Sequence, residues 1–257
     1  MIRLAHLSDI HFGGENVEAV EAATAHLQAS RPALTILSGD LTRFGERAEF
    51  ALAASWVKRL PQPVFATPGN HDAPYIAWAQ RVLSPFARYE RALGQADDLD
   101  FVGQGFHVVG VNTARGAQPR LNWSKGQISR AQVRRAVSRF RPGDGLRVVV
   151  CHHPLMEMEG GPMTARVWGG SEAARAFTEA GVDLVLTGHI HAPFALAYPF
   201  VDRKTYAVGA GTLSGRERGA AASFNEIEIE EAAIRIAALS WTGSGFEPSR
   251  TWSFERR

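Results

Sequence analysis

The chain of 257 residues has little of what marks secreted or membrane proteins. Its one cysteine, Cys151, cannot form an internal disulfide. No apolar run approaches the roughly 20 residues that a transmembrane helix needs. Residues 1–7 have the pattern of a strand and not of a signal peptide. We therefore expect a cytoplasmic protein, with Cys151 as a small buried hydrophobe at the end of an apolar strand.

The sequence also lacks a long Lys/Arg tract, an internal repeat and a linker rich in Pro, Gly and Ser. A formal net charge of +2 suits a small anionic substrate and does not favour a nucleic-acid partner. With 45% hydrophobic residues the chain has ample material for a core. We expect residues 1–257 to form one domain, and a homo-oligomer is compatible with these features.

The first third of the chain alternates between strand and helix patterns. Strands are predicted at 2–7, 33–37 and 64–67, and helices at 17–30 and 45–60. This alternation predicts an α/β fold with a parallel sheet and crossover helices. In such sheets ligands bind beyond the carboxyl ends of the strands.

The rest of the chain is more mixed. We expect a helix at 77–93 that Pro85 bends or splits, a hairpin at 101–111, a polar loop at 112–125, and a helix at 129–140 with a solvated arginine face. Buried strands are predicted at 147–151 and 182–187. Late strands at 204–208, 224–229 and 233–239, with few helices between them, predict an antiparallel second sheet packed on the first.

The stretch Gly69-Asn70-His71-Asp72 follows the third predicted strand directly. We expect Gly69 to supply backbone angles that other residues avoid, so that the next side chains turn into a cleft. Taken alone, these residues are also ordinary turn formers.

Similar polar residues follow the other predicted strands. Asp9 and His11 are two apart, so in an extended segment they would point the same way. Each residue in the set can ligate a borderline divalent metal. Seven ligands suit two ions with a bridging carboxylate, at a separation of about 3.5–4 Å. The candidates are Asp9, His11, Asp40, Asn70, His152, His189 and His191.

These motif blocks, in this order, resemble those of calcineurin-like metallophosphoesterases, over positions 9 to 191. The resemblance implies a four-layer α-β-β-α sandwich, with two packed mixed sheets flanked by helices. The blocks are Asp9-Ile10-His11, Gly39-Asp40, Gly69-Asn70-His71-Asp72, His152 and Gly188-His189-Ile190-His191.

The resemblance also implies roles. One ion would be held by Asp9, His11, His191 and the bridging Asp40, and the other by Asp40, Asn70, His152 and His189. His71 would be the catalytic histidine beside the metals, which in the family are iron, manganese or zinc. Ser/Thr protein phosphatases carry a second Asp in the Asp40 block, but this chain has Arg43 and no Asp from 41 to 45.

Within the family, the Gly39-Asp40-Leu41-Thr42 and Gly69-Asn70-His71-Asp72 blocks are most similar to bacterial class III cyclic-nucleotide and glycerophosphodiester phosphodiesterases. The function implied is hydrolysis of small phosphodiesters by a metal-bridging hydroxide. Alternatives on the same site are a phosphomonoesterase, a nucleotide or lipid pyrophosphatase, and a nuclease. A scaffold that lost catalysis should lack ligands or His71, and none is missing.

Some residues keep two interpretations. His153 is expected to support the site or the structure, and His6, His26 and His107 to be structural or surface residues. Arg216 and Arg218 could meet a phosphate or simply lie on the surface. Trp168 and residues 156–163 could form a lid or pack.

Overall fold

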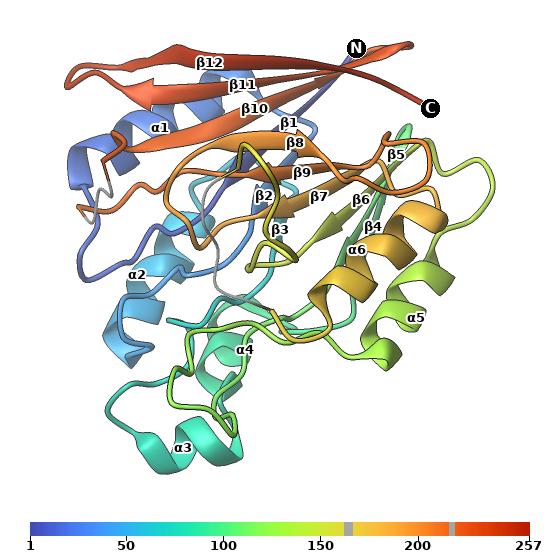
Figure 1. The fold of residues 1–257 in the computed structure, drawn as a ribbon. Helices are drawn as coiled ribbons and strands as arrows, with labels where there is room; N and C mark the ends of the chain where they lie inside the picture. The colour runs from blue at the N-terminus through green and yellow to red at the C-terminus, as the bar shows by residue number, and fades with distance from the viewer. Residues whose placement is uncertain (162–166, 216–218) are drawn as a thin grey trace.

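Two six-stranded sheets pack face to face in the computed structural model, which describes residues 1–161, 167–215 and 219–257 (Figure 1). The first sheet has the order β12-β11-β10-β1-β2-β3, with β1, β2 and β3 parallel and the other pairs antiparallel. Its strands are β1 (Ile2–Leu7), β2 (Leu34–Leu37), β3 (Val64–Ala66), β10 (Ser223–Ile229), β11 (Ala233–Trp241) and β12 (Phe246–Glu255).

The second sheet has the order β4-β5-β6-β7-β9-β8. The central strands β5, β6, β7 and β9 are parallel, and each edge strand is antiparallel to its neighbour. Both sheets are therefore mixed, as expected. The strands are β4 (Leu99–Gly103), β5 (Phe106–Gly110), β6 (Leu146–Val150), β7 (Leu184–Thr187), β8 (Phe194–Ala197) and β9 (Tyr206–Gly209).

Helices cover the outer face of each sheet. Apolar residues of α1, α2 and α4 pack on the first sheet, and those of α5 and α6 pack on the second. Asn16 caps α1, because its side chain accepts a hydrogen bond from the Ala19 N–H. The helices are α1 (Val17–Ser30), α2 (Arg47–Val57), α3 (Trp78–Leu83), α4 (Ala87–Leu93), α5 (Arg130–Arg139) and α6 (Gly170–Glu179).

Three apolar layers separate the four layers of secondary structure. Because side chains alternate along a strand, Leu4 of β1 faces the second sheet while its neighbour Ala5 faces the helices. In β6, Val148 likewise lies between the sheets and Val149 lies under α5 and α6. This arrangement confirms the predicted four-layer α/β sandwich.

The prediction for the late strands is wrong. β10 pairs antiparallel with β1, through Ile2 opposite Ile229, so that β10, β11 and β12 extend the first sheet. β9 instead joins the second sheet, parallel to β7. The alternating pattern of a strand indicates which face is buried but not which free sheet edge it will meet.

Pro85 divides the helix predicted at 77–93 into α3 and α4, because proline disfavours a helical conformation at the residue before it. Of the elements that the structure describes, α6, β8 and β12 were not predicted from the sequence. Among the described residues, no helix is long and apolar enough to cross a membrane.

Candidate metal centre and catalytic histidine

All seven proposed ligands lie in loops that follow parallel strands. Three loops come from the first sheet, after β1, β2 and β3, and two come from the second, after β6 and β7. The two sets meet where the Asp9 carboxylate accepts a hydrogen bond from the His189 N–H, with Oδ2 and N 2.9 Å apart. The sequence prediction that these strand ends converge therefore agrees with the structure.

Five of the seven residues have a left-handed backbone. The φ angles of Asp9, His11, Asp40, His189 and His191 lie between 51° and 71°. Such angles are sparsely populated outside glycine and cluster at functional sites. The expectation that Asp9 and His11 share a direction because they lie in an extended segment is wrong. They converge because both loop residues turn.

One group of ligand atoms forms around Asp9. Asp9 Oδ1 lies 3.1 Å from His191 Nε2 and 3.7 Å from His11 Nε2, and the two imidazole nitrogens are 3.3 Å apart. All three side chains are buried. A carboxylate oxygen and two imidazole nitrogens that converge in this way can hold a divalent ion.

Asp40 connects this group to a second one. Its Oδ2 lies 3.9 Å from His11 Nε2 and 3.2 Å from His152 Nε2. The rings of His152 and His189 are 5.2 Å apart between centroids. Asp40 therefore lies between the two groups, where a bridging ligand would be needed.

Several buried atoms here have no hydrogen-bond partner among the described residues, namely Asp9 Oδ1, His152 Nε2, and Asn70 Oδ1 and Nδ2. Unsatisfied buried polar atoms are rare, and their clustering fits a site that binds metal ions. The other ring nitrogen of His152 is already bonded: Nδ1 donates to the Ser38 carbonyl at 2.8 Å, which leaves Nε2 for a metal. The donor set therefore fits two borderline divalent cations.

The electrostatics also suit cations. Burial raises the pKa of the Asp9 and Asp40 carboxyls, but the charges of His191 and His152 outweigh it and hold both pKa values below the usual range. Burial lowers the pKa of His152, yet Asp40 outweighs burial and raises it to about 9. Burial lowers the pKa of His11 to about 4. Without metal, the charge on His152 would offset the neighbouring Asp40 carboxylate, whereas His11 stays neutral at neutral pH.

Gly69 is required for a reason other than the one predicted. Its φ lies outside the left-handed region, but a Cβ atom there would lie 2.1 Å from Asp40 Oδ1. Gly188 has the same function, because its Cβ would lie 2.4 Å from Asp9 Oδ2. Both glycines let the backbone approach a proposed ligand closely.

Asp72 braces two of the motif loops. Its buried carboxylate accepts hydrogen bonds from the N–H groups of Gly69 and Thr42, at 2.8 and 2.9 Å, and from the Thr42 hydroxyl at 2.9 Å. Burial, followed by repulsion from Asp40, raises the pKa of Asp72 to about 7. The sequence identified Asp72 but could not assign it this function.

His71 lies beside the ligands. Its backbone N–H donates to Asp40 Oδ1 at 2.7 Å, and its ring contacts His11 edge-on at 4.7 Å between centroids. Nδ1 donates to the carbonyl of Arg43 at 2.7 Å. The side chain of Arg43 contacts the Gly13 carbonyl. The backbone of residue 43 therefore supports His71, where protein phosphatases carry an aspartate side chain.

The remaining histidines have partners outside the proposed ligand set, although His153 also forms a group with His152 and His189 whose ring nitrogens lie within 4.8 Å of one another. His153 uses both ring nitrogens, contacting the Thr113 hydroxyl at 2.9 Å and donating to the Ser124 carbonyl at 2.8 Å. The buried His6 contacts Ser38. His26 pairs with Glu226, and His107 lies between Asp100 and Asp144.

The other predictions have mixed outcomes. Cys151 is buried, as expected, and burial raises its pKa to about 12. Arg135 and Arg139, on the outer face of α5, are partly exposed and pair with Asp97 and Asp98 of a neighbouring loop. This confirms the predicted solvated arginine face. Trp168 packs against Arg120, and Met156 and Met158 pack against the apolar layer between the second sheet and its helices. For these three residues the contacts favour packing over a lid. Arg216, Arg218 and residues 162–166 lie outside the described residues.

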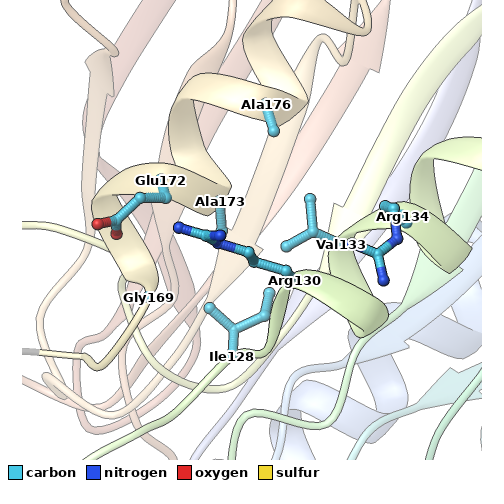
Figure 2. Close-up of a pocket in the computed structure, with 8 residues that line it drawn as sticks. All are labelled: Ile128, Arg130, Val133, Arg134, Gly169, Glu172, Ala173 and Ala176. Atoms are coloured by element: carbon cyan, nitrogen blue, oxygen red, sulfur yellow. The ribbon is translucent and has the colours of Figure 1, made fainter.

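The stretch after β9 also reaches the site, because the Thr212 hydroxyl donates to the Asp9 carbonyl at 2.6 Å. A cavity of about 460 Å³ between α5 and α6 is separate (Figure 2). It is lined by Ile128, Arg130, Val133, Arg134, Gly169, Glu172, Ala173 and Ala176, and by none of the proposed ligands.

Residues 2–193, which contain every motif described above, match the sequence pattern of the calcineurin-like phosphoesterases. The chain belongs to this family. It is a phosphoric ester hydrolase with His/Asp clusters suited to metal, and the resemblance predicted from sequence is confirmed.

Relatives with named activities include a protein from Synechococcus sp. named as a probable cyclic nucleotide phosphodiesterase. It is 25% identical over 212 residues, covering 75% of this chain and 74% of the relative. The glycerophosphodiester phosphodiesterase GpdQ of Enterobacter lignolyticus is 25% identical over 207 residues, covering 73% and 70%. A dimetal phosphatase from Danio rerio shares the fold, with a TM-score of 0.71, 11% identity and coverage of 100% and 99%.

Proposed function

We propose that this calcineurin-like phosphoesterase is a dinuclear-metal phosphodiesterase of small substrates, of the cyclic nucleotide or glycerophosphodiester type. One observation carries the proposal: the buried Asp40 carboxylate lies between two groups of ligand atoms, several of which have no hydrogen-bond partner among the described residues. The names of the two relatives support the choice of diesters. Residues 1–257 form one domain in this proposal.

The ligands divide into two sets that share Asp40. The ions are iron, manganese or zinc, which accept mixed imidazole and carboxylate donors. Bound divalent ions supply Lewis acidity for the phosphoryl oxygens and lower the pKa of water. The first set is Asp9, His11, His191 and Asp40, and the second is Asp40, Asn70, His152 and His189.

The protein's own residues orient the reaction. The Asp40 carboxylate belongs to both ligand sets and accepts a hydrogen bond from the His71 N–H. The position of His71 therefore depends on the proposed bridging ligand. Because the Arg43 carbonyl only accepts, Nδ1 of His71 carries a proton. When the ring is protonated, Nε2–H is also available, and His71 donates this proton to the leaving oxygen.

Position 43 is Arg where the Ser/Thr protein phosphatases carry a second Asp, which supports small substrates over phosphoproteins. The neutral Asn70 supports an anionic substrate. Two divalent ions, two aspartates and a hydroxide leave a net charge of about +1, which a third aspartate would cancel.

The test is a substrate panel on protein loaded with Mn²⁺, Zn²⁺ or Fe²⁺. It contains cyclic nucleotides, glycerophosphodiesters, lipid pyrophosphates, monoesters, a phosphopeptide and single-stranded DNA. We expect a small diester to have the highest kcat/KM, and the ligand variant His191→Ala to lose this activity. A higher kcat/KM for a monoester or pyrophosphate would assign the site to that alternative instead.

A further inference from the structure

The ring of His71 makes a contact that no sequence motif predicted. The Tyr75 ring stacks on it, with centroids 5.1 Å apart and planes 21° from parallel, and the Tyr75 hydroxyl lies 3.5 Å from Nε2. The Arg43 carbonyl holds Nδ1 on the other edge of the imidazole. Together with the edge-on contact from the His11 ring, these two contacts from different loops define the position and plane of the ring.

Core packing does not explain where Tyr75 lies, because 42% of the residue is exposed. Its N–H donates to the Phe44 carbonyl at 2.9 Å, and its ring meets the Phe44 ring edge-on at 5.7 Å. The Arg81 guanidinium lies over the Tyr75 ring, 4.8 Å from the centroid, within the range of a cation–π interaction.

Arg81 is an unusual anchor. It is 6% exposed and forms no ion pair with a carboxylate among the residues that the structure describes. Instead it donates to the carbonyls of Ala73, Pro74 and Gly116, at 2.8, 3.2 and 2.9 Å. Burying an arginine without a carboxylate is unfavourable unless its donors are satisfied. Here that buried cation ties the loop after His71 to the loop around Gly116.

We propose that Tyr75 is a positioning residue for His71 and that Arg81 anchors Tyr75. The inference rests on the proposed function, since it assigns Tyr75 to the same proton transfer. Tyr75 acts through His71 and not on the substrate. Its ring keeps the Nε2 edge of the imidazole directed at the leaving oxygen, and the long contact from its hydroxyl contributes less than the stacked ring.

The first test uses two variants and a matched control. Tyr75→Leu removes the ring, and we expect kcat on an alkyl diester to fall by roughly 10- to 100-fold, with KM unchanged. Tyr75→Phe keeps the ring and should retain most activity. Trp78→Leu, three residues along the chain at a side chain that is 72% exposed, should behave as wild type. A raised KM with unchanged kcat in Tyr75→Leu would show a substrate contact and overturn the assignment.

The second test is a double-mutant cycle. In a His71→Ala background, Tyr75→Leu should cause no further loss, because a residue that acts through His71 has nothing left to position. Multiplying losses would contradict the proposal. If the wild type hydrolyses no phosphodiester at all, the proposed function fails, whereas multiplying losses in an active diesterase overturn only the function of Tyr75.

The third test needs no turnover. Long-range ¹H–¹⁵N spectra of the zinc-loaded protein in alkaline buffer report the tautomer of each histidine, and the His71→Ala variant assigns the signals of His71. We expect His71 to show the Nδ1–H tautomer alone. In Tyr75→Leu, and in Arg81→Met, its signals should move toward the average of both tautomers. Spectra identical to wild type in both variants, with zinc still bound, would mean that the imidazole is held without Tyr75.

Discussion

Asp40 and His71 are joined by a hydrogen bond, 2.7 Å long, from the His71 backbone N–H to Asp40 Oδ1. The other oxygen of the same carboxylate, Oδ2, faces His152 Nε2 at 3.2 Å. The buried carboxyl group that is proposed to bridge the metals therefore also holds the backbone of His71, the proposed proton donor. A change at Asp40 should affect both metal binding and the position of His71.

Asp40→Asn tests the bridge. An amide keeps the size of the side chain but loses a negative charge and one oxygen, so both ions should bind more weakly. Metal titrations followed by elemental analysis measure the effect. The control is His191→Ala, at a ligand of the first set alone, which should weaken one ion more than the other. Two ions bound with unchanged affinity in Asp40→Asn would rule out a shared ligand.

His71→Ala tests proton donation through the leaving group. Loss of a positioned acid typically costs ~10²–10⁴ in rate when the leaving oxygen needs a proton. We expect a loss of this size on an alkyl diester and a much smaller loss on a bis(nitrophenyl) diester, with metal content unchanged. Equal losses on both substrates would indicate that His71 orients the phosphate, and loss of metal would indicate a ligand.

His6 should make stability depend on pH. Burial lowers its pKa to about 3, and the neutral ring fits its contacts, because Asn225 donates toward Nδ1 and Nε2 donates to Ser38. In the unfolded chain its pKa is about 6.5. Between these values the unfolded state binds more protons, so stability is lost as pH falls below about 6.5.

The check is chemical unfolding of metal-free wild type and His6→Gln at several pH values. Wild type should lose about 2 kcal/mol more than His6→Gln between pH 7 and pH 5, because glutamine does not titrate. Above pH 7 the difference between the two proteins should be constant. Parallel curves across the whole range would show that His6 is not held neutral in the fold.

Cys151 should resist alkylation in the native protein. It is fully buried and burial raises its pKa to about 12, so almost no thiolate is available at neutral pH. Iodoacetamide should label it only after unfolding by denaturant, as measured by mass spectrometry. The Cys151→Ala variant should keep its phosphoesterase activity, and rapid labelling of the folded chain would contradict this placement.

The sequence by itself determined the α/β class and the set of candidate ligands. Strand and helix patterns alternate in the first third, and ligands such as Asp9 and Asn70 follow strands directly. Parallel strands place their carboxyl ends at one edge, so local position along the chain was enough to bring these side chains together. The division of one predicted helix at Pro85 could likewise be predicted, because proline restricts the local backbone and breaks a helix whatever surrounds it.

Only the tertiary structure decided the relations between distant segments. Whether β10 would pair with β1 depended on a free sheet edge, which no pattern within β10 encodes. The carboxylate of Asp72 accepts hydrogen bonds from Thr42, and the Tyr75 ring contacts Arg81 and His71. These contacts join loops whose paths are set by packing. Local patterns encode burial and backbone preference, whereas hydrogen bonds and ring contacts between loops depend on the assembled sheets.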